Sequence, residues 1–567
     1  MNSSRKVLGA SVATFFVRRW REFSSAGLIA GTFCFALSLT PSLLPRNFVM
    51  QGVLSGVAFA VGYGVGRLIE LAWELFQLPW PAARWWQVAR LSIALASIAT
   101  VVVFLWQTTH WQNSIRKLME LEPETTAYPF SVGWIALVTA GVLLVVGRGI
   151  QWVWRGINRR MTRVVSPRVA FVLSTLVVVL LLELTVNKIV GKALLRAADK
   201  VFLELDRMED AADSIPTDPF VTGSRESLIE WNSIGRRGRE FLVAGPTQDD
   251  IARFLGRGAQ RPIRVYAGYR SVEDVDARAK LAFDELKRVG GFERSILIVA
   301  TPTGTGWLDE NAVDTVEYLH AGDTAMVAMG YSYLPSWMTL LVDPERSRES
   351  ARALFARVYE HWKTLPRDRR PKLYLHGLSL GSLGAESCTD LYTLIGDPIQ
   401  GGVFSGPPSL SGMWSQLTRD RNPDSPIWLP RFHDGSVVRF TALRNALPAG
   451  GDRWGPVRFV YIQHASDPMV FFFPDLPYRS PAWLQGERGP DVSPYLRWYP
   501  LVTSLQLFFD LATSTNVPLG YGHNYHSSSY IDAWVAVTEP PQWSVGETHR
   551  LKAHFNAARA GAQPSSP

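Results

Sequence analysis

Cysteine is scarce in this sequence, because 567 residues include only Cys34 and Cys388. Cys34 falls in an apolar run and Cys388 in a predicted helix, so we expect neither a disulfide framework nor a cysteine-based zinc site. The ten histidines are scattered and form no His-Glu-x-x-His pattern. The chain also lacks a Gly-Lys-Ser/Thr loop and a dinucleotide-binding glycine fingerprint. We therefore expect no metal and no cofactor.

Acidic residues are scarce in the N-terminal third. Residues 1–200 hold 21 Lys and Arg against 8 Asp and Glu, whereas the remainder holds 37 against 42. The basic excess therefore belongs to the first third, where it fits the flanks of membrane spans. It argues against a nucleic-acid-binding catalytic domain, so we expect no nucleic-acid partner.

Long apolar runs fill the same third. Five of them approach or reach the ~20 residues that cross a bilayer, at 26–44, 53–71, 88–106, 132–147 and 169–189. The alternative is a buried helical domain, but five such runs in succession exceed what soluble proteins show. We predict a transmembrane domain of five helices over residues 1–192, with membrane lipids as its surroundings.

The short loops between these runs differ in basic charge, which sets orientation. Arginines crowd the N-terminus and the fourth loop, and the second loop and its flanks also carry them. The first loop has only Arg46. This pattern predicts a cytoplasmic N-terminus and, after five spans, an extracytoplasmic catalytic domain. A miscount by one span would reverse that side.

Two glycine pairs lie in the second span and its approach, Gly52-x-x-x-Gly56 and Gly62-x-x-x-Gly66. This spacing permits close helix–helix approach. We expect packing within the chain's own bundle rather than dimerisation, and the oligomeric state stays open.

The remaining two-thirds alternate strand-like and helix-like segments. Strand-like runs begin at 263, 295, 324, 372, 401 and 458, and helical patterns cover 272–289, 312–320 and 347–364. This alternation predicts an α/β domain with a mostly parallel sheet covered by helices on both faces. We assign 193–260 to a connecting segment, 261–555 to the catalytic domain and 556–567 to a disordered tail.

The stretch "KLYLHGLSLGSLGAESC" (372–388) contains Gly377-x-Ser379-x-Gly381 between a strand and a helix. A sharp strand-to-helix turn of this kind exposes a serine nucleophile above the sheet. A glycine-rich packing turn is the alternative. We predict that Ser379 is the nucleophile of an α/β-hydrolase fold.

A serine needs an adjacent base, and the expected order along the chain is Ser, acid, His. Asp467 follows a late strand in "RFVYIQHASDPMV", whereas Asp452, Asp475 and Asp491 lack that placement. His523 follows Gly520-x-Gly522 in "PLGYGHNYH". We predict Asp467 as the acid and His523 as the base.

Other histidines fit structural roles better. His526 could be a cap or packing residue, His549 and His554 look solvated, and His376 lies on the strand.

Hydrolysis also needs backbone donors for the developing oxyanion. One is the N–H of Leu380, which follows the nucleophile. The other should come from the loop "ATPTGTGW" after an earlier strand. We predict Thr305 as this donor, with Gly304 and Gly306 beside it, against the alternative of an ordinary Gly/Thr turn.

The stretches "PIRVYAG", "TPTGTGWLDENAVDTVEYLHAGDTAMVAMGYSYLPSW", "RPKLYLHGLSLGSLGAE", "YIQHASDPMVFF" and "GYGHNY" resemble the bacterial membrane-anchored α/β-hydrolases. With the hydrophobic spans, this resemblance covers most of the chain. It implies a serine-hydrolase site of Ser379, Asp467 and His523 in a multi-pass protein of the bacterial plasma (inner) membrane. The family pattern has Glu before the nucleophile, where this chain has Leu378, so the pocket floor should be more apolar.

These features predict a serine esterase or lipase-like hydrolase acting on a lipid or acylated envelope ester. We expect aromatic pocket walls from Tyr331, Tyr333, Trp337 and Trp414, although core packing is the commoner role of each. Transfer of the acyl group to an alcohol remains an alternative, because it uses the same acyl-enzyme. A non-catalytic membrane assembly protein with a hydrolase fold is the other alternative.

Overall fold

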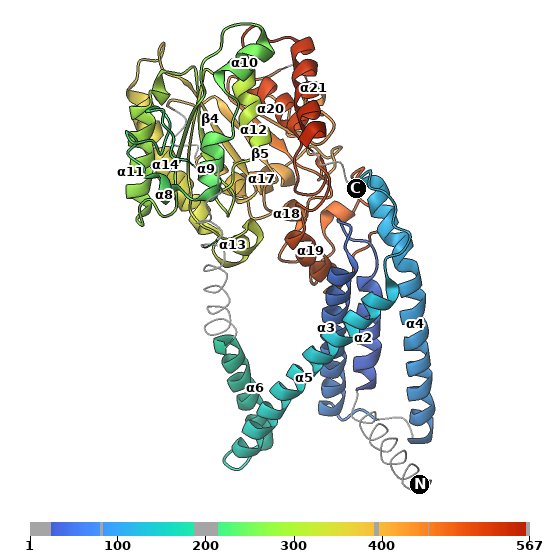
Figure 1. Cartoon of the computed structure of the whole chain (residues 1–567). Helices are drawn as coiled ribbons and strands as arrows, with labels where there is room; N and C mark the ends of the chain where they lie inside the picture. The colour runs from blue at the N-terminus through green and yellow to red at the C-terminus, as the bar shows by residue number, and fades with distance from the viewer. Residues whose placement is uncertain are drawn as a thin grey trace, which may run out of the picture. The chain divides into compact units, whose positions relative to one another are not determined.

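The computed structural model describes residues 24–79, 83–185, 204, 214–389, 396–451 and 453–562 (Figure 1). The chain divides into two compact units. Unit 1 contains residues 1–188 together with 474–481 and 492–510, and unit 2 contains the rest. This division differs from the predicted boundaries, because two segments of the predicted catalytic domain pack with the N-terminal helices.

Unit 1 has a helix at each of the five apolar runs. These helices are α2 (Ser25–Ser38), α3 (Phe48–Leu75), α4 (Ala83–Leu118), α5 (Pro129–Met161) and α6 (Pro167–Glu183).

Among the described residues, three helices of unit 1 are long and apolar enough to cross a membrane: α3, the 88–118 part of α4, and α5. The long apolar helices of the prediction are confirmed to this extent, and they suggest membrane association. The count of five spans stays a prediction, because α2 has 14 residues and α6 has 17. The end of the fifth run, residues 186–189, and the basic N-terminus lie outside the described residues.

The paired glycines of α3 pack against helices of the same chain. A Cβ at Gly52 or Gly56 would lie within 2.8 Å of atoms of α5. A Cβ at Gly62 or Gly66 would lie 2.5 or 2.2 Å from backbone carbonyl oxygens of α2. The expected packing within the chain's own bundle is therefore confirmed for these glycines.

The segment 492–510 joins unit 1 through polar contacts with the turn after α2. Gln506, on α19 (Val502–Ala512), donates through its side-chain amide to the carbonyl oxygen of Thr40 at 2.9 Å. Asp510 forms an ion pair with Arg46 at 2.9 Å. These contacts explain why this segment belongs to unit 1 despite its late position in the chain.

Unit 2 contains a seven-stranded sheet whose strands are all parallel, which confirms the predicted α/β-hydrolase fold class. The spatial order is β1-β3-β2-β4-β5-β7-β6. The strands are β1 (Ile263–Ala267), β2 (Ile296–Thr301), β3 (Thr324–Met329), β4 (Lys372–Leu378), β5 (Gly401–Ser405), β6 (Val438–Thr441) and β7 (Arg458–Ile462). Most of their residues are apolar and buried, as expected where helices cover both faces of a sheet.

Helices surround this sheet (Figure 1). α11, α14 and α15 pack in succession, and α12, α20 and α21 form a second group. The helices of unit 2 are α8 (Trp231–Ile234), α9 (Arg236–Val243), α10 (Gln248–Leu255), α11 (Val275–Arg288), α12 (Glu310–Leu319), α13 (Ser336–Val342), α14 (Glu345–Thr364), α15 (Leu380–Glu386), α17 (Gly412–Arg419), α18 (Pro468–Phe471), α20 (Ser527–Thr538) and α21 (Val545–Ala562).

The described part of the connecting segment 193–260 contains α8, α9 and α10, and its boundaries stay a prediction. At the other end, α21 continues to Ala562, because the alanines after residue 556 favour helix. Most of the predicted disordered tail is therefore helical, and residues 563–567 lie outside the described residues.

The register of the central strands brings four carboxyl ends to one edge of the sheet. Thr301 of β2 pairs with Gly377 of β4, and Leu378 of β4 pairs with Ser405 of β5. Ser405 in turn pairs with Ile462 of β7. The segments that follow these strands therefore emerge side by side, where ligands of parallel sheets bind.

Candidate active site

The turn between β4 and α15 holds Ser379 in a strained backbone conformation, with φ 59° and ψ −127°. Residues other than glycine rarely adopt positive φ, and such strain clusters at functional sites. A Cβ at Gly377 would lie 2.2 Å from the carbonyl oxygen of Gly381. A Cβ at Gly381 would lie 2.1 Å from the carbonyl oxygen of Thr301. Close backbone approach therefore requires both glycines of the motif.

The Ser379 side chain is fully buried. Its backbone N–H donates to the carbonyl oxygen of Ser405 at 2.9 Å, which ties the turn to the end of β5. Within the described residues, its Oγ has no hydrogen-bond partner. A buried hydroxyl without a partner is unusual and suits a group that acts in a reaction.

Asp467 and His523 meet although 56 residues separate them in sequence. His523 Nδ1 lies 2.7 Å from Asp467 Oδ2, and the second carboxylate oxygen accepts the N–H of Met469 at 2.8 Å. Both side chains are buried. The carboxylate therefore fixes the imidazole with Nδ1–H toward Asp467, which leaves Nε2 for another partner.

The His523 ring lies over the end of β5, the strand that also holds the Ser379 turn. A Cβ at Gly406 would lie 2.5 Å from His523 Cε1. Gly406 directly follows Ser405, whose carbonyl oxygen accepts the Ser379 N–H. Nε2 of His523 is buried and, like Ser379 Oγ, has no partner among the described residues. The two unpartnered atoms thus belong to residues held at the same strand end.

Tyr525 also reaches the Asp467 carboxylate, which the sequence analysis missed. Its hydroxyl donates to Asp467 Oδ2 at 2.7 Å. The signal was present in "GYGHNYH", because Tyr525 lies two residues after His523.

Asp491 holds the loops that carry the acid and the histidine. One of its oxygens accepts the N–H of Ser466 at 2.9 Å and the Ser466 hydroxyl at 2.6 Å. The same hydroxyl oxygen accepts the N–H of Gly522 at 2.9 Å. Asp491, a competitor for the acid role, therefore binds Ser466 beside Asp467, and Ser466 in turn binds Gly522 beside His523.

The remaining candidate acids lie elsewhere. Asp475 belongs to unit 1, where it is partly exposed beside Arg479. Asp452 lies outside the described residues.

The other histidines weighed for the base role lie at different places in the fold. His526 caps α20, with Nδ1 accepting the N–H of Ser528 at 3.0 Å. His376 is buried on β4 beside the carbonyl oxygen of Val403, and burial lowers its pKa to about 4. His554 lies on α21, 3.3 Å from the Tyr318 hydroxyl, and His549 lies on the same helix.

The loop after β2 packs on the first turn of α15, where the oxyanion donors are expected. The N–H of Gly304 donates to Ser336 Oγ at 3.1 Å, and that of Gly306 donates to the carbonyl oxygen of Thr303 at 2.9 Å. Among the described residues, the N–H of Thr305 donates to no backbone acceptor. This arrangement leaves Thr305 N–H, with Leu380 N–H on α15, as the candidate pair.

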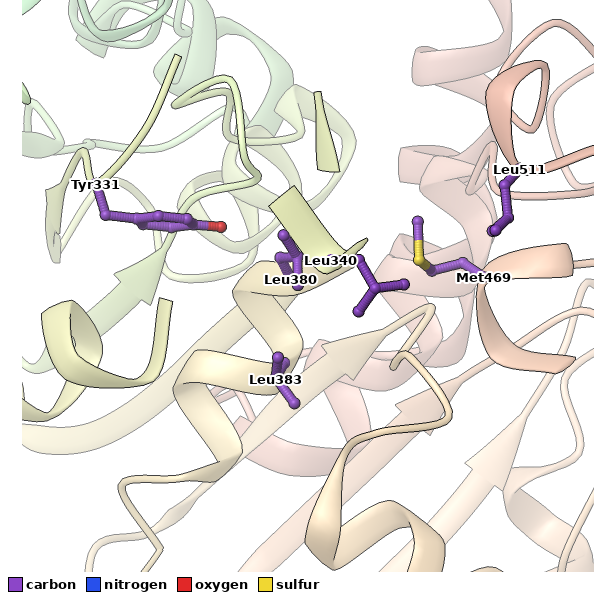
Figure 2. Close-up of a cluster of buried hydrophobic side chains, with 6 residues drawn as sticks. All are labelled: Tyr331, Leu340, Leu380, Leu383, Met469 and Leu511. Carbon is purple, nitrogen blue, oxygen red and sulfur yellow. The ribbon is translucent and has the colours of Figure 1, made fainter. Parts of the chain in front are cut away.

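A buried apolar cluster, here called the Leu380 cluster, contains Leu380, which directly follows Ser379, and Met469, which lies two residues after Asp467 (Figure 2). Trp337 and Phe472 pack against it while partly buried. Its buried members are Tyr331, Leu340, Leu380, Leu383, Met469 and Leu511.

The four predicted wall aromatics fall into two groups. Tyr331 belongs to the Leu380 cluster and Trp337 packs on it. Tyr333 packs edge-on against Tyr269 at 5.0 Å between ring centroids. Trp414 is fully buried and its indole N–H donates to Gln463 at 2.7 Å, which is a core position. Of the four, Tyr331 and Trp337 are therefore the two that share contacts with Leu380, the residue after Ser379.

A small pocket of about 10 Å³ is lined by Thr305, Gly306 and Tyr333. A cavity of about 880 Å³ lies among α14, α15 and α17, and Phe355, Glu386 and Cys388 line it. None of Ser379, Asp467 and His523 contributes to its lining. Among the described residues, no group of His, Cys, Asp or Glu could hold a metal ion.

Comparisons with known proteins give two family matches. Residues 263–551 match the alpha/beta-hydrolase family, and residues 39–246 match the alpha/beta-hydrolase family N-terminus. No curated protein matches the chain.

One solved structure is similar to part of the chain, the Trichoderma reesei cutinase in complex with a C11Y4 phosphonate inhibitor. The match has 14% sequence identity, a TM-score of 0.18, and covers 42% of this chain and 86% of the cutinase chain. A similarity this weak does not bear on activity.

Proposed function

Since the chain belongs to the alpha/beta-hydrolase family, we propose that it is a membrane-anchored serine hydrolase that cleaves carboxylic esters. Ser379 is the nucleophile, His523 the general base and Asp467 the acid that orients it. The observation that carries this proposal is the 2.7 Å hydrogen bond between His523 Nδ1 and Asp467 Oδ2. It supports the role of His523 because the ring is held over the end of β5, where the carbonyl oxygen of Ser405 accepts the N–H of Ser379.

In the proposed reaction, His523 Nε2 takes the proton from Ser379 Oγ as the oxygen attacks the ester carbonyl carbon. The tetrahedral oxyanion accepts hydrogen bonds from the N–H groups of Leu380 and Thr305. His523 then gives the proton to the departing alcohol, which leaves an acyl-enzyme. Water, deprotonated by the same imidazole, attacks the acyl carbon and releases the carboxylic acid and Ser379.

The Leu380 cluster supports an apolar acyl chain as the substrate's main feature. Leu380 and Leu383 lie one and four residues after the nucleophile, and Met469 lies two residues after the acid. We propose that side chains of this cluster contact the acyl chain of a substrate that Ser379 attacks. Because Ser379 is fully buried, entry of an acyl chain requires these side chains to separate.

Lipids or acylated envelope molecules are the proposed substrates, because they combine an ester with an apolar chain. The three long apolar helices support a location at a membrane. We place the protein in the bacterial plasma membrane with its catalytic domain extracytoplasmic. Protease added outside intact spheroplasts should then cut the catalytic domain, and cleavage restricted to inside-out vesicles would reverse the orientation.

The test of the enzymatic proposal uses the full chain in detergent or vesicles. A fluorophosphonate probe should label the wild type and fail to label Ser379→Ala. Ser382→Ala is the matched control, because Ser382 is an equally buried hydroxyl three residues later on α15. Labelling retained in Ser379→Ala would remove the assigned nucleophile, and no labelling of the wild type would favour a non-catalytic assembly protein.

A series of p-nitrophenyl esters from acetate to palmitate tests the acyl preference. Longer chains should give higher kcat/KM, since each buried CH₂ contributes about 0.8 kcal/mol. Adding a competing alcohol separates hydrolysis from acyl transfer. A product ester that outweighs the free acid would identify an acyltransferase that uses the same residues.

A further inference from the structure

The Asp467 carboxylate accepts three hydrogen bonds: one from its own loop, one from His523 and a third from Tyr525. Oδ1 accepts the N–H of Met469 at 2.8 Å, and Oδ2 accepts His523 Nδ1 at 2.7 Å. The Tyr525 hydroxyl donates to the same Oδ2 at 2.7 Å. Asp467 and Tyr525 are both buried. A buried carboxylate gains more from each donor than an exposed one, because water cannot replace it.

The Tyr525 hydroxyl can only act as a donor in this contact, because an ionised carboxylate only accepts. Burial and the charge of Asp467 raise the pKa of Tyr525 well above its ordinary value. The hydroxyl therefore keeps its proton throughout the pH range in which the enzyme can work.

Packing holds the Tyr525 ring in place. The ring stacks on His464 with centroids 4.4 Å apart, and it meets the His523 ring edge-on at 5.8 Å. A Cβ at Gly406 would lie 3.0 Å from Tyr525 Cε2. The hydroxyl is thus fixed from three sides, so its contact with Asp467 does not depend on a freely rotating side chain.

The loop that carries His523 also delivers Tyr525. Between them, Asn524 is pinned, since its carbonyl oxygen accepts the N–H of Gly520 at 2.7 Å and its side-chain amide donates to Val517 at 2.8 Å. Two side chains from one pinned loop therefore converge on one carboxylate oxygen.

We propose that Tyr525 is a positioning residue for the Asp467–His523 pair, whose hydroxyl fixes the orientation of the carboxylate and shares its negative charge. This inference rests on the proposed function, because it assigns Tyr525 a role in the same proton transfer. When His523 takes the Ser379 proton, Asp467 must stabilise the imidazolium. Tyr525 keeps the carboxylate aligned for that step and moderates how strongly it holds the proton on His523.

The titratable groups that face Asp467, His523 and Tyr525 come from three parts of the fold. His464 and Asp491 lie in the segment after β7, and Tyr530 lies on α20. Asp309, at the start of α12, lies beyond Tyr530. Burial lowers the pKa of His464, so its ring stays neutral near pH 7. These groups are unchanged in a Tyr525→Phe variant, so a shift in its pH profile reports the lost hydroxyl.

Tyr525→Phe tests the proposal because it removes the hydroxyl and leaves the stacked ring. After normalisation to fluorophosphonate-titrated sites, kcat/KM should fall about tenfold, with KM nearly unchanged. The acidic limb of the pH–rate profile should move to higher pH by about half a unit. Without the Tyr525 hydroxyl as a donor, the negative charge on Asp467 Oδ2 attracts the proton on the imidazole more strongly. Tyr359→Phe is the matched control, because it also removes one buried tyrosine hydroxyl, which bonds to the carbonyl oxygen of Asp397 at 2.8 Å.

An unchanged pH profile in Tyr525→Phe, with only lower thermal stability, would reduce Tyr525 to a structural role and overturn the proposal. Proton NMR of the His523 Nδ1–H resonance separates this outcome from failure of the proposed function, because it needs no turnover. That resonance should move downfield in Tyr525→Phe and stay in place in Tyr359→Phe. If the resonance does not move, the inference about Tyr525 is overturned, even if Ser379 reacts with the probe. If the resonance moves but Ser379 is not labelled, only the proposed hydrolase function is contradicted.

Discussion

Asp510 and Arg46 form a 2.9 Å ion pair within unit 1, although 464 residues separate them in sequence. Their side chains are 0% and 1% exposed. The second Asp510 oxygen accepts the N–H of Leu43 at 3.1 Å, and Arg46 also donates to Gln51 at 2.8 Å. Because water reaches neither charge, removing one partner leaves the other buried and unpaired.

We predict that Asp510→Asn lowers the free energy of unfolding of unit 1 by about 3–5 kcal/mol. Thermal unfolding in detergent measures the loss, and faster hydrogen exchange over 502–512 locates it. Glu124→Gln serves as the control, since it removes a partly exposed partner of Arg116 at the same 2.9 Å distance. That control should cost under about 1 kcal/mol. Equal losses in the two variants would contradict a special role for the buried pair.

Gly66 and Gly64 on α3 provide a matched pair of substitutions. A Cβ at Gly66 would lie 2.2 Å from the backbone carbonyl oxygen of Ala26, whereas a Cβ at Gly64 meets nothing within 4 Å. Gly66→Ala should therefore push α2 from α3 and lower the melting temperature in detergent. Gly64→Ala should be neutral or stabilising, since Ala favours helix over Gly by about 1 kcal/mol. Unfolding at the same temperature in both variants would show that α2 and α3 do not need this close approach.

Glu386 is a buried carboxyl group that predicts pH-dependent stability. Its oxygens accept the N–H groups of Met413 and Trp414 and the hydroxyl of Tyr461. Burial raises its pKa from 4.5 to about 7. The folded state therefore holds a proton that the unfolded state releases between about pH 4.5 and 7. Its stabilising contribution is full below pH 4.5 and declines until pH 7, by about 3 kcal/mol in total.

The comparison of wild type with Glu386→Gln isolates this contribution. The difference between the two unfolding free energies should slope between pH 4.5 and 7 and be flat above pH 7. Asp309, whose pKa burial raises to about 7, gives a slope of the same sign that both proteins share. A difference that does not vary with pH would show that Glu386 titrates normally in the fold.

Much of unit 2 could be predicted from the sequence, because its strands are short buried apolar runs flanked by helical patterns. Six of the seven strands begin within one residue of the predicted runs. The exception is β6 (Val438–Thr441), an edge strand of four residues with Arg439 inside it. Four residues between loop segments are too few to show the alternation of apolar and polar residues that predicts a strand.

The features that the sequence did not predict depend on hydrogen bonds and ion pairs between residues far apart in the chain. Tyr525 on Asp467, Asp491 on Ser466 and Asp510 on Arg46 each depend on the fold to bring the partners together. No periodicity marks such contacts in a sequence. For the same reason, residues 492–510 were predicted in the catalytic domain, whereas their side chains pack with unit 1.

We predict that substituting the two buried acids near the histidine loop, Asp467 and Asp491, lowers activity to different extents. Asp467→Asn keeps the volume but removes the charge beside His523 Nδ1, so the ring can adopt the wrong tautomer. We expect kcat to fall by about 10⁴-fold. In Asp491→Asn, the remaining amide oxygen can still accept a hydrogen bond from Ser466, but the bond is weaker. The loop before His523 therefore loosens, while Asp467 stays in place as the acid. We expect about a tenfold loss for this variant. Both rates are normalised to sites titrated by a fluorophosphonate, because loosening the loop could also lower the fraction of active protein. A larger loss in Asp491→Asn than in Asp467→Asn would reverse the roles, and Asp491 would then be the acid on which His523 depends.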